Sequence, residues 1–371
     1  MIVGTVKEIK NHEYRVGLTP ESAHELVAHG HTVLVQTGAG AGIGAADDAY
    51  VAAGAEIVMS AAEVFARAEM VVKVKEPQAG ERAMLREGQI LYTYLHLAPD
   101  PEQTADLVKS GAVCIAYETV TDAGGGLPLL KPMSQVAGRM AIQAGATALE
   151  KAHGGRGVLL GGVPGVMPAK VVVIGGGVVG FNAAQMATGL GADVTIIDRS
   201  PEVLEKLATH FESRAKTLYA GKANIAAAVA EADLVIGAVL VPGAAAPKLV
   251  TRAMLSTMQP GAVLVDVAID QGGCFETSHA TTHAEPTYVV DGVVHYCVAN
   301  MPGGVARTST YALNNVTLPH ALAIANLGWK AALTRNPHLA NGLNVAFGRV
   351  TYEAVAKDLG YDYIPAADLI G

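Results

Sequence analysis

The chain has 371 residues, of which 51% are hydrophobic and 16% charged, which argues against disorder and predicts two domains with separate cores. Its net charge of −8 argues against nucleic acid or an anionic membrane as a partner. Cys114, Cys274 and Cys297 are scattered without C-x-x-C spacing, so they fit a reducing cytoplasm and offer no zinc or other metal site and no disulfide framework.

The sequence contains two stretches that could be mistaken for membrane signals, and neither has the required composition. The first eight residues lack the basic segment and apolar core of a signal peptide. The apolar stretch 157–180 contains Pro164, Pro168 and several glycines, which a lipid-exposed helix does not tolerate. We therefore expect a cytoplasmic protein with no membrane span.

The first 130 residues alternate short apolar runs with helical patterns. The expected strands are Ile2–Val6, Thr32–Gln36, Met70–Val74, Ile90–Tyr94 and Ala112–Tyr117. The expected helices are Pro20–His29, Ala61–Arg67, Glu81–Arg86 and Glu102–Ser110. Such alternation predicts an α/β fold with a doubly wound parallel sheet.

A glycine-rich turn follows the apolar run at residues 171–174. Gly175, Gly177 and Gly180 have the G-x-G-x-x-G spacing, and a helical pattern follows at Phe181–Leu190. The first glycine allows a tight turn, the second lets backbone approach a pyrophosphate, and the third lets helix and strand pack closely. A second strand then ends at Asp198, where a carboxylate can hold a ribose hydroxyl. The pattern predicts a dinucleotide site, and the alternative is a glycine-rich turn in a cofactor-free sheet.

The rest of the chain extends this pattern. A long helix is expected from about Ser134 to Ala152, and the alternation of strands and helices resumes after Asp198 as far as Val298. From Thr308 onwards the pattern is helical, with no new strands, so we expect this tail to pack on the first lobe. We predict two Rossmann-like lobes joined by long helices around a cleft. Residues 1–130 and 306–371 would form the substrate domain, and residues 131–305 the dinucleotide-binding domain.

Several polar residues lie near or just past the ends of predicted strands, and ligands of open α/β sheets bind beyond the carboxyl ends of strands. They are Lys73, Lys75, His96, Glu118, Asp270 and Asn300, with Arg15 in the loop after the first strand. Each also has a structural interpretation. His96 could cap a turn, Arg15 could be a solvated charge, and Asp270 could form a turn. These residues indicate a two-lobed nicotinamide dehydrogenase that acts on a small anionic substrate.

Five motifs sharpen this hypothesis. They are Lys73-Val-Lys-Glu-Pro77, Tyr94-Leu-His-Leu-Ala98, Lys131-Pro-Met-Ser134, Ile269-Asp-Gln-Gly-Gly-Cys-Phe-Glu276 and Val298-Ala-Asn-Met-Pro302. Together they resemble the bacterial alanine dehydrogenases, from Met1 almost to the end of the chain. The related proton-translocating transhydrogenase subunit shares the fold and a weaker version of some motifs.

The resemblance implies reversible oxidative deamination of L-alanine to pyruvate and ammonium with NAD. It implies that Arg15 and Lys75 bind the substrate, that His96 is the acid/base, and that Asp270 assists. A planar guanidinium suits a carboxylate, and a histidine with an ordinary pKa near 6.5 suits proton transfer at neutral pH. It also implies a homo-oligomer, a hexamer in this family.

For the cofactor, the resemblance points to residues of the second lobe. They are Ser134, Gly175, Gly177, Val178, Gly180, Asp198, Val239, Leu240, Val267, Ala268, Ile269, Asp270, Val298, Ala299, Asn300 and Met301. His279 stands where the family pattern leads us to expect an arginine that helps to hold the cofactor. Arg199 lies beside Asp198, and because an arginine can accommodate a 2′-phosphate, NADP stays an alternative cofactor. Two alternatives stay open: the NAD(H)-binding subunit of a transhydrogenase, and a silent NAD-binding protein on the same fold.

Overall fold

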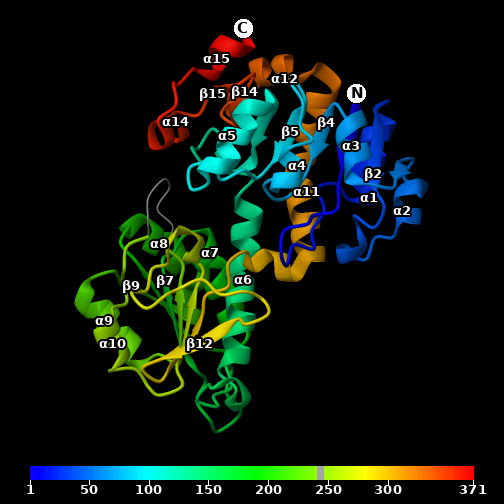
Figure 1. Cartoon of the computed structure of the whole chain (residues 1–371). Helices are drawn as coiled ribbons and strands as arrows, with labels where there is room; N and C mark the ends of the chain where they lie inside the picture. Colours follow the sequence, from blue (N-terminus) through cyan, green and yellow to red (C-terminus); the bar gives the residue numbers. More distant parts are fainter. Residues whose placement is uncertain (240–245) are drawn as a thin grey trace. The chain divides into compact units, whose positions relative to one another are not determined.

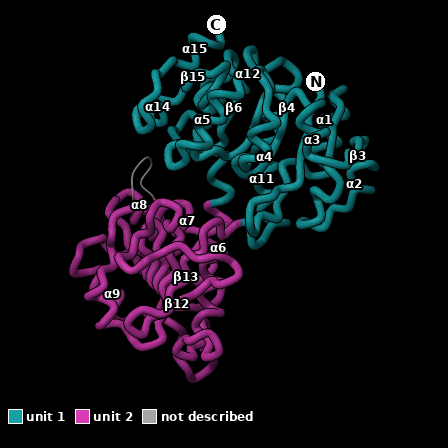
Figure 2. The backbone as a smooth tube through the Cα atoms, in the orientation of Figure 1, with its two compact units in different colours: residues 1–133, 303–371 teal, residues 134–302 magenta. Residues whose placement is uncertain are grey.

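The computed structural model describes residues 1–239 and 246–371, so Leu240 lies outside the described residues. The chain divides into two compact units, shown in Figure 2. Unit 1 comprises Met1–Met133 and Gly303–Gly371, and unit 2 comprises Ser134–Pro302. Each unit contains its own mainly parallel sheet, so the predicted α/β class with two Rossmann-like sheets is confirmed.

Unit 1, all of whose residues the structure describes, has an eight-stranded sheet in the order β15-β14-β6-β5-β4-β1-β2-β3. The strands are β1 (Ile2–Thr5), β2 (Thr32–Gln36), β3 (Glu56–Val58), β4 (Met70–Val72), β5 (Ile90–Thr93), β6 (Val113–Ala116), β14 (Leu343–Ala346) and β15 (Arg349–Val350). The strands from β6 to β3 are parallel, whereas β14 and β15 form an antiparallel edge.

The helices of unit 1 are drawn in Figure 1, and several of them begin next to a capping side chain. Thr19, Ser60 and Asp100 each accept a hydrogen bond from a backbone N–H in the first turn of the following helix. The helices are α1 (Pro20–Ala28), α2 (Asp47–Ala52), α3 (Ala61–Arg67), α4 (Ala79–Arg82), α5 (Pro101–Ser110), α11 (Ala306–Leu327), α12 (Trp329–Arg335), α13 (Pro337–Ala340), α14 (Glu353–Leu359) and α15 (Ala366–Ile370). Helix α6 (Lys131–Ala148) begins in unit 1 and continues into unit 2.

The expectation that the tail adds no strands is wrong. Strand β14 pairs antiparallel with β6, and β15 pairs with β14, so the tail extends the first sheet. Strand β15 has only two residues, and Asn344 interrupts the apolar run of β14, so neither segment reads as a buried strand. Strand β3 was not predicted either, and its three residues begin with the charged Glu56.

The described part of unit 2 forms a seven-stranded sheet in the order β12-β13-β11-β10-β7-β8-β9, parallel except for β12. The strands are β7 (Lys170–Ile174), β8 (Asp193–Asp198), β9 (Ala215–Tyr219), β10 (Leu234–Gly237), β11 (Val263–Asp266), β12 (Thr287–Val290) and β13 (Val293–Tyr296). The helices are α7 (Val178–Gly189), α8 (Pro201–Phe211), α9 (Lys222–Glu231) and α10 (Arg252–Leu255). Both faces are covered, because Val171 and Val173 pack in one core and Val172 and Ile174 in another.

The described residues also bear on the expectations about cysteines, metals and membranes. The cysteines Cys114, Cys274 and Cys297 are buried there and carry free thiols. Within the ranges 1–239 and 246–371, no group of three or more His, Cys, Asp or Glu side chains could hold a metal ion. None of the helices that the structure describes combines the length and apolar character needed to cross a membrane.

A buried histidine ties β13 to the loop before β12. The His295 ring is fully buried, with Nδ1 3.0 Å from the Val293 carbonyl oxygen and Nε2 2.7 Å from the Thr277 hydroxyl oxygen. A neutral ring satisfies both contacts, with Nδ1–H donating to Val293 and Nε2 accepting from Thr277. Burial lowers the pKa of His295 below its ordinary value.

We predict that His295 contributes to a loss of stability in mild acid. Because its folded-state pKa is lowered, the unfolded chain binds more protons below about pH 6.5, so stability falls as pH drops through that value. His295→Gln should reduce the fall in melting temperature between pH 7.5 and 5.5, whereas exposed His24→Gln should leave it unchanged. Equal slopes for all three proteins would show that His295 titrates normally.

Candidate active site

The polar residues of unit 1 gather at one edge of its sheet. Strands β6, β5, β4 and β1 are parallel neighbours, so their carboxyl ends meet there. The chain runs from β1 outward to β2 and β3 and then returns to the other side of β1 as β4. The switch point of the sheet therefore lies between β1 and β4, which is where ligands bind in open α/β sheets. Arg15 follows β1, Lys75 follows β4 and His96 follows β5.

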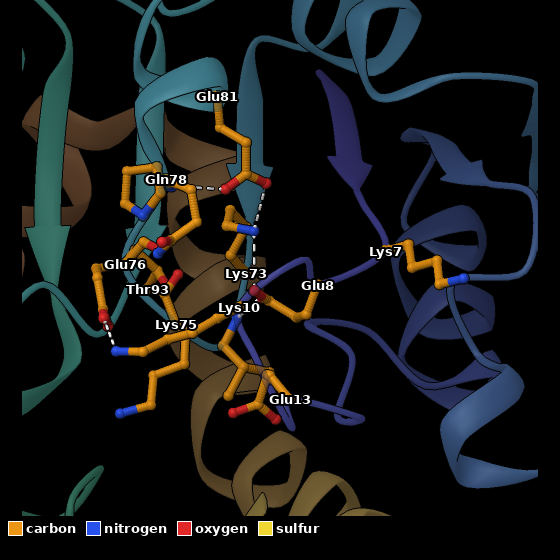
Figure 3. Close-up of polar contacts among 12 residues, drawn as sticks. Lys7, Glu8, Lys10, Glu13, Lys73, Lys75, Glu76, Gln78, Glu81 and Thr93 are labelled. Atoms are coloured by element: carbon orange, nitrogen blue, oxygen red, sulfur yellow. Dashed lines mark hydrogen bonds and ion pairs between the residues drawn. The ribbon is translucent and has the colours of Figure 1, made fainter. Parts of the chain in front are cut away.

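The two lysines after β4 occupy different environments. Lys73 is fully buried, and its ammonium contacts the carboxylates of Glu8 and Glu81. Lys75 is half-buried, and Figure 3 shows its side chain running away from that of Lys73. The Glu76 carboxylate pairs with Lys10. Burial raises the pKa of Glu76, but the ammoniums of Lys75 and Lys10 outweigh it and lower the pKa overall. Lys75 is thus partly accessible to a ligand, whereas Lys73 is part of a buried ionic cluster.

His96 adopts a backbone conformation that a histidine seldom takes. Its φ is +51°, in the left-handed region, and its side chain is 45% exposed. The Glu118 carboxylate accepts hydrogen bonds from the backbone N–H of His96 at 2.6 Å and of Leu95 at 3.2 Å, and lies 4.0 Å from His96 Nδ1. The Tyr94 ring stacks parallel to the imidazole, with ring centroids 5.8 Å apart. The turn therefore presents the imidazole at the surface on a fixed backbone.

Arg15 is buried and is not the solvated charge that its loop position would allow. Its side chain is 2% exposed, and Nε and one terminal nitrogen donate to the two Glu13 oxygens at 2.7 and 2.5 Å. The other terminal nitrogen lies 3.0 Å from the Met133 sulfur. Burial alone would lower the pKa of Arg15. The hydrogen bonds and the charge of Glu13 outweigh this effect and raise the pKa overall, so the guanidinium stays charged. The bidentate geometry expected with a substrate carboxylate is made here with Glu13.

The three fingerprint glycines of unit 2 have three different surroundings. Gly175 has φ +104°, which only glycine adopts readily, and it ends β7. Gly177 caps α7, which begins at Val178, and no described heavy atom lies within 4 Å of a Cβ built on Gly177. A Cβ on Gly180 would collide with the Gly175 carbonyl oxygen. The turn thus leaves open space beside Gly177, at the amino end of a helix whose first N–H groups suit a phosphate.

Asp198 ends β8 and is tied to this turn. One carboxylate oxygen accepts from the backbone N–H of Gly176 at 2.6 Å, and the other from that of Ser200 at 2.8 Å. The side chain is half-buried, whereas Arg199 is exposed. Asp198 therefore stands beside the glycine turn, where the carboxylate of a dinucleotide site is required.

The remaining predicted cofactor residues follow β10, β11 and β13, apart from half-buried Ser134 in α6. Val239 follows β10. Val267, Ala268, Ile269 and Asp270 follow β11, and Val298, Ala299, Asn300 and Met301 follow β13. Asp270 is exposed, and Asn300 has φ +59°. The strand order switches direction between β7 and β10, so these segments share the ligand-binding edge of their sheet.

Four carboxylates hold the loops of the site, and of these the sequence pointed only to Glu118. Glu8, Glu13 and Glu118 do so in unit 1. Fully buried Asp266 does so in unit 2, where it accepts from the backbone N–H of Ala268, Cys274 and Phe275 and from the Ser278 hydroxyl. Their positions inside a strand or in the loop after one could have marked these acidic residues as candidates. The sequence does not show which N–H group or cation each of them would contact.

Comparisons with known proteins agree on one family. Models described as the N-terminal and C-terminal domains of Alanine dehydrogenase/PNT match residues 4–137 and 141–353. An alanine dehydrogenase of Halomonas elongata is 62% identical over 371 residues, covering 100% of both chains. A solved L-alanine dehydrogenase has a TM-score of 0.95 and 55% identity, covering 97% of this chain and 99% of that one. This chain belongs to the alanine dehydrogenase family.

Membership of the alanine dehydrogenase family confirms the resemblance predicted from the motifs, and it implies a nicotinamide dinucleotide cofactor. A transhydrogenase from Sinorhizobium meliloti is less similar, at 27% identity and a TM-score of 0.82, covering 95% of this chain and 100% of that one. The transhydrogenase alternative is therefore the weaker of the two.

The glycine turn separates a packing role from a binding role. We predict that Gly180→Ala lowers the melting temperature, since its methyl group has no room, by an amount equivalent to roughly 2 kcal/mol or more. Gly177→Ala should leave the melting temperature close to wild type but weaken NADH binding, because its methyl group occupies the space a pyrophosphate would approach. Fluorescence titration with NADH and thermal melting check both. If Gly177→Ala binds NADH as tightly as the wild type does, the pyrophosphate does not bind at this turn.

Proposed function

We propose that the chain catalyses the reversible NAD-dependent oxidative deamination of L-alanine. L-alanine, NAD⁺ and water give pyruvate, ammonium, NADH and a proton. The observation that carries the proposal is that Arg15, Lys75 and His96 follow the neighbouring parallel strands β1, β4 and β5 of one sheet, in a chain of the alanine dehydrogenase family. Unit 1 is the proposed substrate domain and unit 2 the proposed NAD-binding domain.

In this proposal the cations of unit 1 bind the substrate. Lys75 contacts the carboxylate of alanine or pyruvate and polarises the C2 oxygen of pyruvate. Buried Arg15 is the second proposed substrate-binding cation. Its guanidinium is bonded to Glu13, so a substrate carboxylate would have to replace Glu13 to form the bidentate contact.

His96 and Asp270 are the proposed catalytic residues. During deamination, His96 takes the proton of the water that adds to the C2 iminium, and it returns a proton to the departing amine. A carboxylate at Asp270 stabilises the positive charge of the iminium and orients the water. The exposed imidazole stacks on Tyr94 and stands on a backbone that Glu118 holds, which supports the role of His96, because an acid/base must reach substrate from a fixed backbone.

NAD is the proposed dinucleotide. The nicotinamide supplies hydride transfer when it is bound. Gly175, Gly177, Val178 and Gly180 would receive the pyrophosphate, Asp198 would accept from the ribose hydroxyls, and the segments after β10, β11 and β13 would hold the nicotinamide half. The open space at Gly177 is the observation that fits the group.

The remaining parts of the proposal concern assembly and location. By resemblance, the chain forms a homohexamer. It works in the cytoplasm on small molecules alone, with no nucleic acid or membrane as a partner.

The role of His96 can be tested without disturbing its turn. Asparagine tolerates the left-handed conformation better than alanine does, so His96→Asn removes the imidazole and keeps the backbone. We expect kcat for alanine to fall by roughly 10²–10⁴ with little change in melting temperature or NADH affinity. His24→Gln on α1 is the control and should retain wild-type kcat. If the His96→Asn enzyme keeps more than about a tenth of wild-type kcat, His96 is not the acid/base and serves only to cap its turn.

The cofactor preference follows from Asp198. Its charge should repel a 2′-phosphate, so kcat/KM should favour NAD over NADP by at least roughly two orders of magnitude. Asp198→Asn keeps an oxygen for the Gly176 N–H but removes the charge, and should narrow the preference. Steady-state kinetics with both cofactors measure it. Equal efficiencies in the wild type would mean that Arg199 accommodates the phosphate.

A further inference from the structure

A buried ionic cluster lies directly beneath the segment that carries Lys75. It consists of Glu8, Lys73 and Glu81, called here the buried triad (Figure 3). Lys73 Nζ lies 3.0 Å from a Glu8 oxygen and 2.8 Å from a Glu81 oxygen. The three side chains are 0, 2 and 3% exposed for Lys73, Glu8 and Glu81. Two carboxylates thus share one ammonium at the switch point between β1 and β4.

The two carboxylates use their second oxygens differently. The second oxygen of Glu8 accepts from the backbone N–H of Val74 at 2.7 Å and of Lys75 at 3.3 Å. The second oxygen of Glu81 accepts from the backbone N–H of Gln78 at 2.8 Å, at the start of α4. Both bind Lys73 equally well, but only Glu8 holds the backbone of Lys75.

Glu8 completes a full set of backbone hydrogen bonds. All six backbone polar groups of residues 73–75 have partners in the structure, and Glu8 supplies two of them. The Lys73 N–H donates to the Tyr92 carbonyl, and the Lys73 carbonyl accepts from the Tyr117 hydroxyl. The Val74 carbonyl accepts from the Tyr94 N–H, and the Lys75 carbonyl from the Thr93 hydroxyl. The backbone below the Lys75 side chain is therefore held on every side.

We propose that Glu8 is a positioning residue for substrate binding: anchored by Lys73, it fixes the backbone of Val74 and Lys75 and so directs the Lys75 ammonium toward the substrate. This inference rests on the proposed function, in which Lys75 contacts the substrate. A shift of about 1 Å in a binding group lowers activity by up to about a hundredfold. Loss of the Glu8 contacts should therefore be felt through Lys75.

The triad offers its own matched control. Glu8→Gln and Glu81→Gln each leave one carboxylate paired with Lys73, so each variant keeps a balanced buried pair. Burial raises the pKa of Glu8, and repulsion from Glu81 adds to this against the attraction of Lys73. Removing one of the two carboxylates therefore relieves excess negative charge, and both variants should fold. A glutamine has one acceptor oxygen and cannot serve Lys73 and the backbone N–H groups together.

The test measures KM for pyruvate, kcat, NADH affinity and melting temperature in both variants. Glu8→Gln should raise KM for pyruvate by roughly tenfold or more. Glu81→Gln should change it by less than about threefold, at a similar melting temperature and with wild-type NADH affinity. If both variants shift KM equally, the triad is merely structural and the proposal fails. Should Glu8→Gln not fold, Glu8→Asp keeps the charge but shortens the reach, and the same rise in KM is expected.

A double-variant cycle separates this inference from the proposed function. Lys75→Met removes the ammonium and keeps the length of the side chain. If Lys75→Met leaves KM for pyruvate unchanged, the substrate role of Lys75 is wrong. If it raises KM, Glu8→Gln should add little in the Lys75→Met background, because Glu8 acts through Lys75. Full additivity of the two changes would overturn the positioning role while leaving the proposed function intact.

Discussion

Parallel strands place the loops that follow them at one edge of a sheet, and the backbone of those loops leaves the hydrogen-bonding ladder. Side chains must then accept from its N–H groups. In both units carboxylates do this: Glu8 for residues 74 and 75, Glu118 for 95 and 96, Asp198 for 176 and 200, and Asp266 for 268, 274 and 275. The candidate site thus depends on acidic residues that brace its loops.

These acidic residues also shape the charge of the site. A buried carboxylate needs a cation or several hydrogen-bond donors. Asp266 is satisfied by backbone N–H groups and the Ser278 hydroxyl, whereas Glu8 and Glu13 are paired with cations. Glu8 and Glu81 lie against Lys73, and Glu13 lies against Arg15. The edge that would receive an anionic substrate is therefore lined with compensated charges. Compensation keeps the cations ionised while it prevents them from repelling one another at close range.

Local spacing made part of this architecture predictable. The glycine fingerprint and Asp198 are encoded within one stretch of chain, and the structure places them together as the spacing required. The fully buried central strands were found because β-branched runs mark buried parallel strands, whereas the partly exposed edge strand β9 was not predicted. The family itself was recognisable from motifs distributed over both lobes, as the relatives confirm.

Partnerships between distant residues were not predictable. Glu8 and Lys73 are 65 positions apart, and no pattern in one chain announces that two charges will meet. Arg15 looked like a loop residue because its burial depends on Glu13 and on Met133, which is 118 positions away. Strand β14 was not predicted because Asn344 interrupts its apolar run, and its conformation depends on pairing with the distant strand β6.

The left-handed backbone at His96 has a consequence for how the sequence drifts. A β-carbon at φ +51° is disfavoured, so conformational stability alone would carry this position toward glycine or asparagine over generations of neutral substitution. An imidazole at position 96 therefore carries backbone strain, as the imidazole of His12 does at φ +54°. A glycine at position 96 would relieve that strain and remove the imidazole in the same step.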